Sequence, residues 1–106
     1  MERNNLFSAI PAQLPQELFE TLLKRDGLRL ERIVSHGHST APDEWYDQKS
    51  DEWVILLSGS ATLLFENGES QQLRPGDYLL IPAHCRHRVE ATDLKEKSVW
   101  LALHLE

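Results

Sequence analysis

One carboxylate at the start of an apolar segment is the first candidate for chemistry. Glu52 precedes five apolar residues (53–57), and in an extended chain it lies on the same face as Val54 and Leu56. Its side chain is therefore expected to point inward. An unpaired ionised carboxylate in an apolar interior costs several kcal/mol, or its pKa rises. We therefore expect a partner for Glu52, which would be a metal ion, a protonated His87 or an arginine.

A cluster of aromatic and polar residues lies just upstream of this carboxylate. In the run Trp45-Tyr46-Asp47-Gln48, the rings could stack on a ligand while the polar groups orient it. We predict that Trp45, Tyr46 and Asp47 bind a ligand at the mouth of a pocket. Tyr46 could also donate a hydrogen bond or a proton, which makes it the candidate catalytic residue. The alternative is that these residues only pack within a long loop.

Two histidines, His36 and His38, are separated by one glycine. On an extended segment, residues at i and i+2 face the same way, and this spacing suits chelation of a metal. The alternative is that both are loop or surface residues beside a flexible Gly37.

The sequence around His87 is His84-Cys85-Arg86-His87-Arg88. Strand alternation puts Arg86 and Arg88 on the face opposite His87. There we expect a solvated outer face or pairing with acidic side chains, with anion binding as the alternative. Cys85 is the only cysteine, so the chain can form neither an intramolecular disulfide nor a cysteine-based zinc site. A lone thiol suits a reducing compartment, and we expect the protein in the cytoplasm.

The first element that could position these residues is a short helix. Residues 16–24 carry leucines at helical spacing, such as Leu18 and Leu22. Pro15 could occupy the first helical position, and Gly27 could end the helix. We predict an N-terminal segment, residues 1–27, whose short α-helix packs on the main domain.

From residue 28 onward the apolar pattern has a period of two. Turn signals separate the short segments, and Asn67-Gly68 is the dipeptide preferred in two-residue hairpin turns. The predicted strands cover residues 28–34, 52–57, 61–65, 71–73, 78–81, 84–91 and 98–105. This pattern indicates an all-β fold, an antiparallel sandwich or barrel, over residues 28–106. A chain of 106 residues is long enough for one domain only.

Two segments of the chain resemble the motifs of the cupin family. The second family motif, G-x5-P-x-G-x2-H-x3-N, matches at Gly76, Pro82 and His87. The end of the first motif, G-x5-H-x-H-x(3,4)-E-x6-G, matches at Glu52 and Gly59. The resemblance covers approximately residues 28–105. It implies a cupin-type β-barrel of the RmlC-like superfamily, a double-stranded β-helix or jelly roll.

The departures from these motifs bear on metal binding. In the second motif, His84 stands where the family has glycine, and Ala91 stands where it has asparagine. In the first motif, the two histidine positions fall on Tyr46 and Gln48 at one allowed spacing, or on Trp45 and Asp47 at the other. In metal-binding cupins, the two missing histidines converge on one divalent ion with the motif glutamate and the second-motif histidine.

The residues that remain could still hold an ion. Glu52 and His87 are kept, Gln48 could add an amide oxygen, and Asp47 could add a carboxylate. We predict a metal site at Gln48, Glu52 and His87 for Fe, Mn, Ni or Zn. His36 and His38 could enter the barrel and replace the missing ligands. The alternative is a polar cluster held by hydrogen bonds.

Three functions follow from the resemblance and the residues. The first is a small cupin that binds a divalent metal and a small polar or acidic molecule, and it could be a metal-dependent enzyme. The second is a metal-free module that binds or senses a small molecule. The third is a structural or partner-binding cupin without catalysis.

Charge and surface pattern bear on partners. A net charge of −6 argues against general affinity for nucleic acid or an anionic membrane. Trp53, Ile55 and Leu57 form a second apolar face opposite Glu52, and a small barrel has only one interior. We therefore predict a homodimer that buries this outer face.

Overall fold

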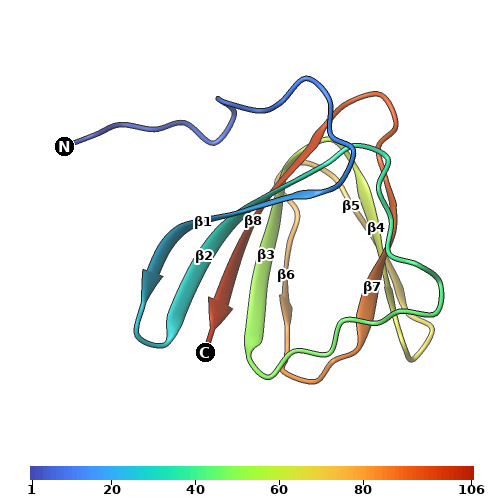
Figure 1. Cartoon of the computed structure of the whole chain (residues 1–106). Coiled ribbons are helices and arrows are strands. Elements are labelled where there is room, and N and C mark those ends of the chain that lie inside the picture. Colours follow the sequence, from blue (N-terminus) through green and yellow to red (C-terminus); the bar gives the residue numbers. More distant parts are fainter.

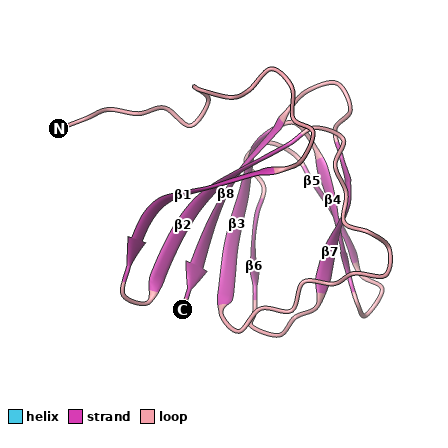
Figure 2. Ribbon diagram, in the orientation of Figure 1, coloured by secondary structure: helices cyan, strands magenta, loops and turns pink.

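Eight β-strands joined by loops and turns make up the computed structural model, which describes residues 1–106 (Figure 2). No helix of the structure could cross a membrane. The strands are β1 (Leu18–Arg25), β2 (Leu28–Ser35), β3 (Asp51–Ser58), β4 (Ala61–Phe65), β5 (Ser70–Leu73), β6 (Tyr78–Ile81), β7 (His87–Thr92) and β8 (Ser98–Leu105).

The strands form two antiparallel sheets that face each other (Figure 1). One sheet has the order β1-β2-β8-β3-β6, and the other has the order β5-β4-β7. Alternate residues of each sheet point into the space between them. Val54, Leu56 and Trp100 of the larger sheet pack there against Leu63 and Phe65 of the smaller one. The prediction of an all-β antiparallel fold is therefore confirmed.

The predicted N-terminal helix is wrong, because residues 18–25 form strand β1. This strand pairs with β2, for example Phe19 with Ile33 and Arg25 with Leu28, and Gly27 lies in the turn between them with a φ of 75°. A bulge between Thr21 and Leu23 shifts the register, so the apolar residues do not alternate regularly. A helix this short is marginal in water, whereas the free edge of β2 supplies a full set of hydrogen-bond partners.

Strand β7 begins three residues later than predicted. Residues 84–86 belong to the loop from β6 to β7, where His84 has a φ of 61°. The backbone N–H of His84 donates to the Gln48 carbonyl across 2.8 Å. This contact ties the loop before β7 to the loop before β3, which places Gln48 and His87 at the same end of the barrel.

Gly59 lies between β3 and β4, at the corner where the chain leaves the larger sheet and enters the smaller one. Its φ is 78°, a region that favours glycine. The corner packs against the start of β8, where the Ser98 hydroxyl donates to the Ser60 carbonyl across 3.0 Å. This glycine, which ends the first sequence motif, therefore allows the two sheets to be joined.

Candidate functional site

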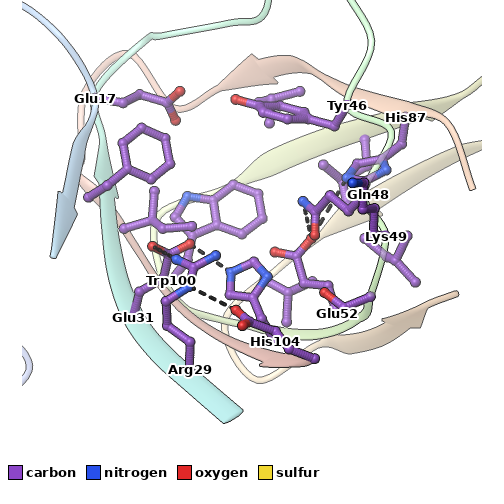
Figure 3. Close-up of a pocket in the computed structure, with 18 residues that line it drawn as sticks. Glu17, Arg29, Glu31, Tyr46, Gln48, Lys49, Glu52, His87, Trp100 and His104 are labelled. Atoms are coloured by element: carbon purple, nitrogen blue, oxygen red, sulfur yellow. Dashed lines mark hydrogen bonds and ion pairs between the residues drawn. The ribbon is translucent and has the colours of Figure 1, made fainter. Parts of the chain in front are cut away.

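A cavity of about 750 Å³ opens between the two sheets (Figure 3). Its volume lies within the range of small-molecule sites. Three aromatic side chains, Phe19, Tyr46 and Trp100, line it together with aliphatic residues. Its charged and polar lining residues are Glu17, Arg29, Glu31, Gln48, Lys49, Ser50, Glu52, His87, His104 and Glu106.

Glu52, His87 and Gln48, the residues predicted to form a metal site, meet at one end of this cavity. Glu52 is 7% exposed and His87 is 5% exposed, and His87 Nε2 lies 3.8 Å from Glu52 Oε1. The Gln48 amide donates to the same carboxylate oxygen across 3.2 Å. The inward carboxylate of Glu52 therefore lies beside a histidine and accepts a hydrogen bond from an amide.

Tyr46 joins this group through the backbone. A bridge between Tyr46 and His87, with hydrogen bonds of 2.7 and 3.1 Å in the two directions, places their rings 5.6 Å apart. Burial raises the pKa of the Tyr46 phenol, and the Glu17 and Glu52 carboxylates raise it further. Tyr46 therefore keeps its proton at neutral pH and can donate a hydrogen bond to a ligand.

Sequence reasoning missed a second group in the cavity, beside Glu52, which is the cross-strand neighbour of His104. His104 Nε2 lies 2.8 Å from Glu31 Oε1, and Arg29 Nη1 lies 3.0 Å from Glu31 Oε2. A signal for it exists, because Glu31 has the parity of Ile33 on β2 and His104 has the parity of Trp100 on β8. The pairing of β2 with β8 brings these residues together.

The buried Glu31 carboxylate is the basis of a pH prediction. Burial on its own would raise the pKa of Glu31, but the hydrogen bond from His104 and the charges of His104 and Arg29 hold the pKa below its ordinary value of 4.5. A lowered folded-state pKa contributes stability above pH 4.5, and this stability is lost as the pH falls through the folded-state value. Glu31→Gln should therefore show a shallower fall in the free energy of unfolding below pH 4.5.

Urea denaturation of the wild type and of Glu31→Gln, at pH values from about 6 down to about 3, measures how steeply the free energy of unfolding falls with pH. Glu2→Gln, which changes an exposed residue near the N-terminus, is the matched control and should follow the wild type. If the free energy of unfolding fell equally steeply with pH in the wild type and in Glu31→Gln, the predicted contribution of Glu31 to stability would be contradicted.

Trp45 and Asp47 lie outside the cavity, although the sequence predicts both as ligand-binding residues. They alternate with Tyr46 and Gln48, so the bridge that turns Tyr46 inward turns its neighbours outward. Asp47 Oδ1 lies 3.0 Å from His84 Nδ1. The guanidinium carbons of Arg86 and Arg88 lie 6.0 and 5.3 Å from the Trp45 ring centroid. Both arginines therefore occupy the outer face, as predicted.

His36 and His38 also lie apart from the cavity lining. They follow β2 in a turn that contains Gly37, whose φ is 74°. The backbone N–H of His36 donates to His38 Nδ1 across 2.9 Å, which occupies one nitrogen of that ring. The two histidines therefore do not join Glu52 in the cavity lining.

The donor set at Glu52 does not fit a resident metal ion. Metal sites in proteins are built from three or four ligands, and no group of three His, Cys, Asp or Glu side chains is arranged to hold one. Only Glu52 and His87 are strong donors here, and Gln48 presents its amide nitrogen to the carboxylate. The Glu52 carboxylate thus has protein partners in place of the missing motif histidines.

More carboxylates than cations line the cavity. Four carboxylates, those of Glu17, Glu31, Glu52 and Glu106, face only two permanent cations, Arg29 and Lys49. Arg29 is itself paired with Glu31 and Glu106, at 3.0 and 3.3 Å. The carboxylates therefore outnumber the permanent cations of the lining four to two, so the cavity offers many hydrogen-bond acceptors.

Comparison with known families and structures identifies similar proteins. The sequence model of the cupin domain family matches residues 31–104. A candidate mannose-6-phosphate isomerase from Ralstonia eutropha JMP134 is 48% identical, with a TM-score of 0.95 over 100% of this chain and 99% of that chain. A cupin superfamily protein from Desulfitobacterium hafniense DCB-2 is 26% identical, with a TM-score of 0.79 over 99% and 92% of the two chains.

A more distant structure has the same fold. The RmlC-like cupin with a double-stranded β-helix from Methanocaldococcus jannaschii is 15% identical and has a TM-score of 0.70, over 91% of this chain and 85% of that chain. No protein of curated function matches the chain.

Proposed function

The chain belongs to the cupin domain family, and from this we propose that its barrel binds a small, uncharged polyhydroxy molecule without a metal ion. One observation carries the proposal, which is the excess of carboxylates over cations in a cavity that also contains three aromatic rings. Hydroxyl groups donate hydrogen bonds to carboxylates, and the apolar faces of a sugar-like molecule pack on aromatic rings.

The cavity charge favours the polar ligand over the acidic one, both of which are expected from the sequence. An anionic ligand would have to approach four carboxylates, while one of the two cations, Arg29, is already paired. Like charges in a partly buried site repel each other strongly, because the effective dielectric constant there is low. An uncharged ligand avoids this cost and still satisfies the acceptors.

The donor set favours the metal-free form of this function. The Gln48, Glu52 and His87 side chains hydrogen-bond or pair with one another, and no third ionisable donor joins them. In this proposal they contact the ligand directly. Tyr46 lies at the same end and donates its phenolic proton to the ligand as a hydrogen bond.

The Ralstonia eutropha relative bears on the class of ligand. Its name refers to an isomerase of a phosphorylated sugar, and the two chains are 48% identical. A sugar framework agrees with the hydrogen-bond acceptors of this cavity. A phosphate group does not agree with its acidic lining, so we propose an unphosphorylated sugar or a similar polyol for this chain.

Ligand-observed saturation-transfer NMR with D-mannose and mannose 6-phosphate tests the proposal. We expect the uncharged sugar to bind more tightly than its phosphate. Glu52→Gln should weaken binding about tenfold, because it removes a charged acceptor of a ligand hydroxyl. Glu66→Gln is the matched control, since Glu66 pairs with Arg86 away from the cavity, and it should bind like the wild type. Tighter binding of the phosphate would contradict the proposal.

We propose that the outer face of the larger sheet mediates a homodimer. Trp53, Tyr78, Leu80 and Leu105 present apolar groups there, and Tyr78 and Leu80 are 63% and 58% exposed. The accessible surface of the chain is 6976 Å². A monomer of this mass typically exposes roughly 6,100 Å². A second copy would cover the apolar groups of this outer face.

Light scattering at micromolar concentration measures the mass in solution. We expect twice the chain mass of 12.2 kDa for the wild type and a monomer for Leu80→Arg, which places a charge in the apolar face. Leu94→Arg is the control, because Leu94 is an exposed loop residue, and it should remain a dimer. A monomeric wild type would contradict the dimer.

We further propose that the protein acts in the cytoplasm, with a small molecule as its ligand. A single cysteine is compatible with a reducing compartment, and the net charge of −6 opposes binding to nucleic acid or anionic lipid.

A further inference from the structure

A row of three apolar side chains crosses the inner face of the larger sheet. Phe19 on β1 pairs with Ile33 on β2, and Ile33 pairs with Trp100 on β8. All three line the cavity, and none occupies a position of the two sequence motifs. We call Phe19, Ile33 and Trp100 the apolar row. It is a part of the cavity wall to which neither the motifs nor the polar group at Glu52 gives a role.

The apolar row extends from the closed interior of the barrel to its open side. Trp100 is 3% exposed, Ile33 is partly buried against the core, and Phe19 is 52% exposed. Strand β1 is the edge of the larger sheet, and the hairpin of β1 and β2 lies on the side away from the smaller sheet (Figure 1). An exposed aromatic ring that continues the wall of a cavity is a surface on which the apolar part of a ligand can pack.

The polar atoms next to the apolar row are bonded within the protein. Trp100 Nε1–H donates to Ser35 Oγ across 3.3 Å, and the Ser35 hydroxyl donates to Glu17 Oε2 across 2.5 Å. The indole N–H therefore needs no partner on a ligand. Phe19 and Ile33 have no polar side-chain atoms, so hydroxyl groups placed against them would lose their hydrogen bonds to water without replacement. The apolar row therefore fits an apolar group better than a second sugar.

The cavity is large enough for a ligand that reaches both the polar group and the apolar row. Figure 3 shows Glu52, Gln48 and His87 together on one side of the cavity. The sheet order β1-β2-β8-β3 places three strand spacings, about 14 Å, between β1 and β3. A single sugar ring held beside Glu52 therefore leaves Phe19 uncovered. The cavity volume of about 750 Å³ is typical of sites for drug-sized molecules.

We propose that the ligand is an aryl glycoside, an uncharged sugar that carries an aromatic group, and that the apolar row binds this aromatic group. The inference rests on the proposed function, because the sugar part is the uncharged polyhydroxy molecule of that proposal. The sugar hydroxyls bond to the polar group at Glu52. The aromatic ring packs on Ile33 and on the face of Phe19, and Trp100 contacts both parts of the ligand, since β8 lies between β2 and β3.

Isothermal titration calorimetry with phenyl α-D-mannoside and methyl α-D-mannoside tests the inference. The two probes share the sugar and its linkage and differ only in the apolar group. We expect the wild-type protein to bind the phenyl mannoside about tenfold more tightly, because the phenyl ring leaves water for the apolar row. Phe19→Ala should bring the ratio of the two dissociation constants close to one. Phe19→Leu keeps an apolar side chain and should give an intermediate ratio.

Phe7→Ala is the matched control for these variants. Phe7 is 56% exposed, much like Phe19, but it lies outside the cavity lining. The control variant should keep the wild-type ratio of the two dissociation constants. An equal loss in Phe7→Ala and Phe19→Ala would show that the ratio does not report contact with the apolar row, and would overturn the inference.

The remaining outcomes separate the inference from the proposed function. Equal binding of the two mannosides by the wild type, or an unchanged ratio in Phe19→Ala, would overturn the inference alone. Tighter binding of mannobiose than of phenyl mannoside would overturn it in favour of a second sugar. A dimeric wild type with a monomeric Phe19→Ala in light scattering would overturn it in favour of a second copy covering Phe19. Absence of binding for both mannosides and for D-mannose would overturn the proposed function as well.

Discussion

Replacing Gly59 with alanine is expected to lower the free energy of unfolding by about 2–5 kcal/mol. A Cβ atom at this position would lie 2.3 Å from Ser98 Oγ and 2.7 Å from Ser98 Cα, so the backbone of β8 would have to move. The φ of 78° adds the strain of a left-handed conformation. The loss is a large part of the stability of a typical domain, which is about 5–15 kcal/mol.

Gly76→Ala is the matched control for this prediction. Gly76 also has a positive φ, 95°, but a Cβ atom there would meet nothing within 4 Å. Its replacement should cost only the conformational strain, about 1–2 kcal/mol. Denaturation by urea measures both values. Equal losses for the two variants would show that close packing against Ser98 is not what requires Gly59.

Replacing Trp100 with alanine is the second change with a large expected effect. Trp100 is 3% exposed, its ring lines the cavity, and its Nε1–H donates to Ser35 Oγ across 3.3 Å. Loss of such a side chain removes its buried area and leaves a void, which costs about 3–5 kcal/mol. The variant should also bind D-mannose more weakly, because an aromatic surface of the cavity is gone.

Trp100→Phe separates the ring from the hydrogen bond. Phenylalanine keeps an aromatic face toward the cavity but loses the contact with Ser35, so it should lose less stability than alanine and still bind the sugar. Denaturation by urea and saturation-transfer NMR measure the two effects. If the phenylalanine variant were as unstable and as weak in binding as the alanine variant, the indole N–H and not the ring would matter.

Much of one end of the site could be predicted from the sequence. The parity of Glu52 along its strand predicts an inward side chain, and the motif match predicts His87, which lies beside it at 3.8 Å. Tyr46 and Gln48 also line the cavity, whereas Trp45 and Asp47 point away. Local sequence could not decide between these two alternating pairs, because the bridge to His87 sets the register.

The Glu31–His104 pair could not be predicted, because its members are 73 residues apart in sequence. Parity gives the face of each strand, but it does not say which residues of two distant strands lie next to each other. The same limit applies to strand β1. The spacing of Leu18 and Leu22 is compatible with a helix, and only the free edge of β2 makes a strand more favourable.

We propose that the cavity binds an uncharged polyhydroxy molecule without a metal ion. Saturation-transfer NMR with D-mannose, before and after removal of metals with EDTA, tests it most directly when elemental analysis verifies that the metals have been removed. We expect D-mannose to bind with the same strength in both samples. Binding that disappears with EDTA and returns with Fe, Mn, Ni or Zn, or no binding in either sample, would contradict it.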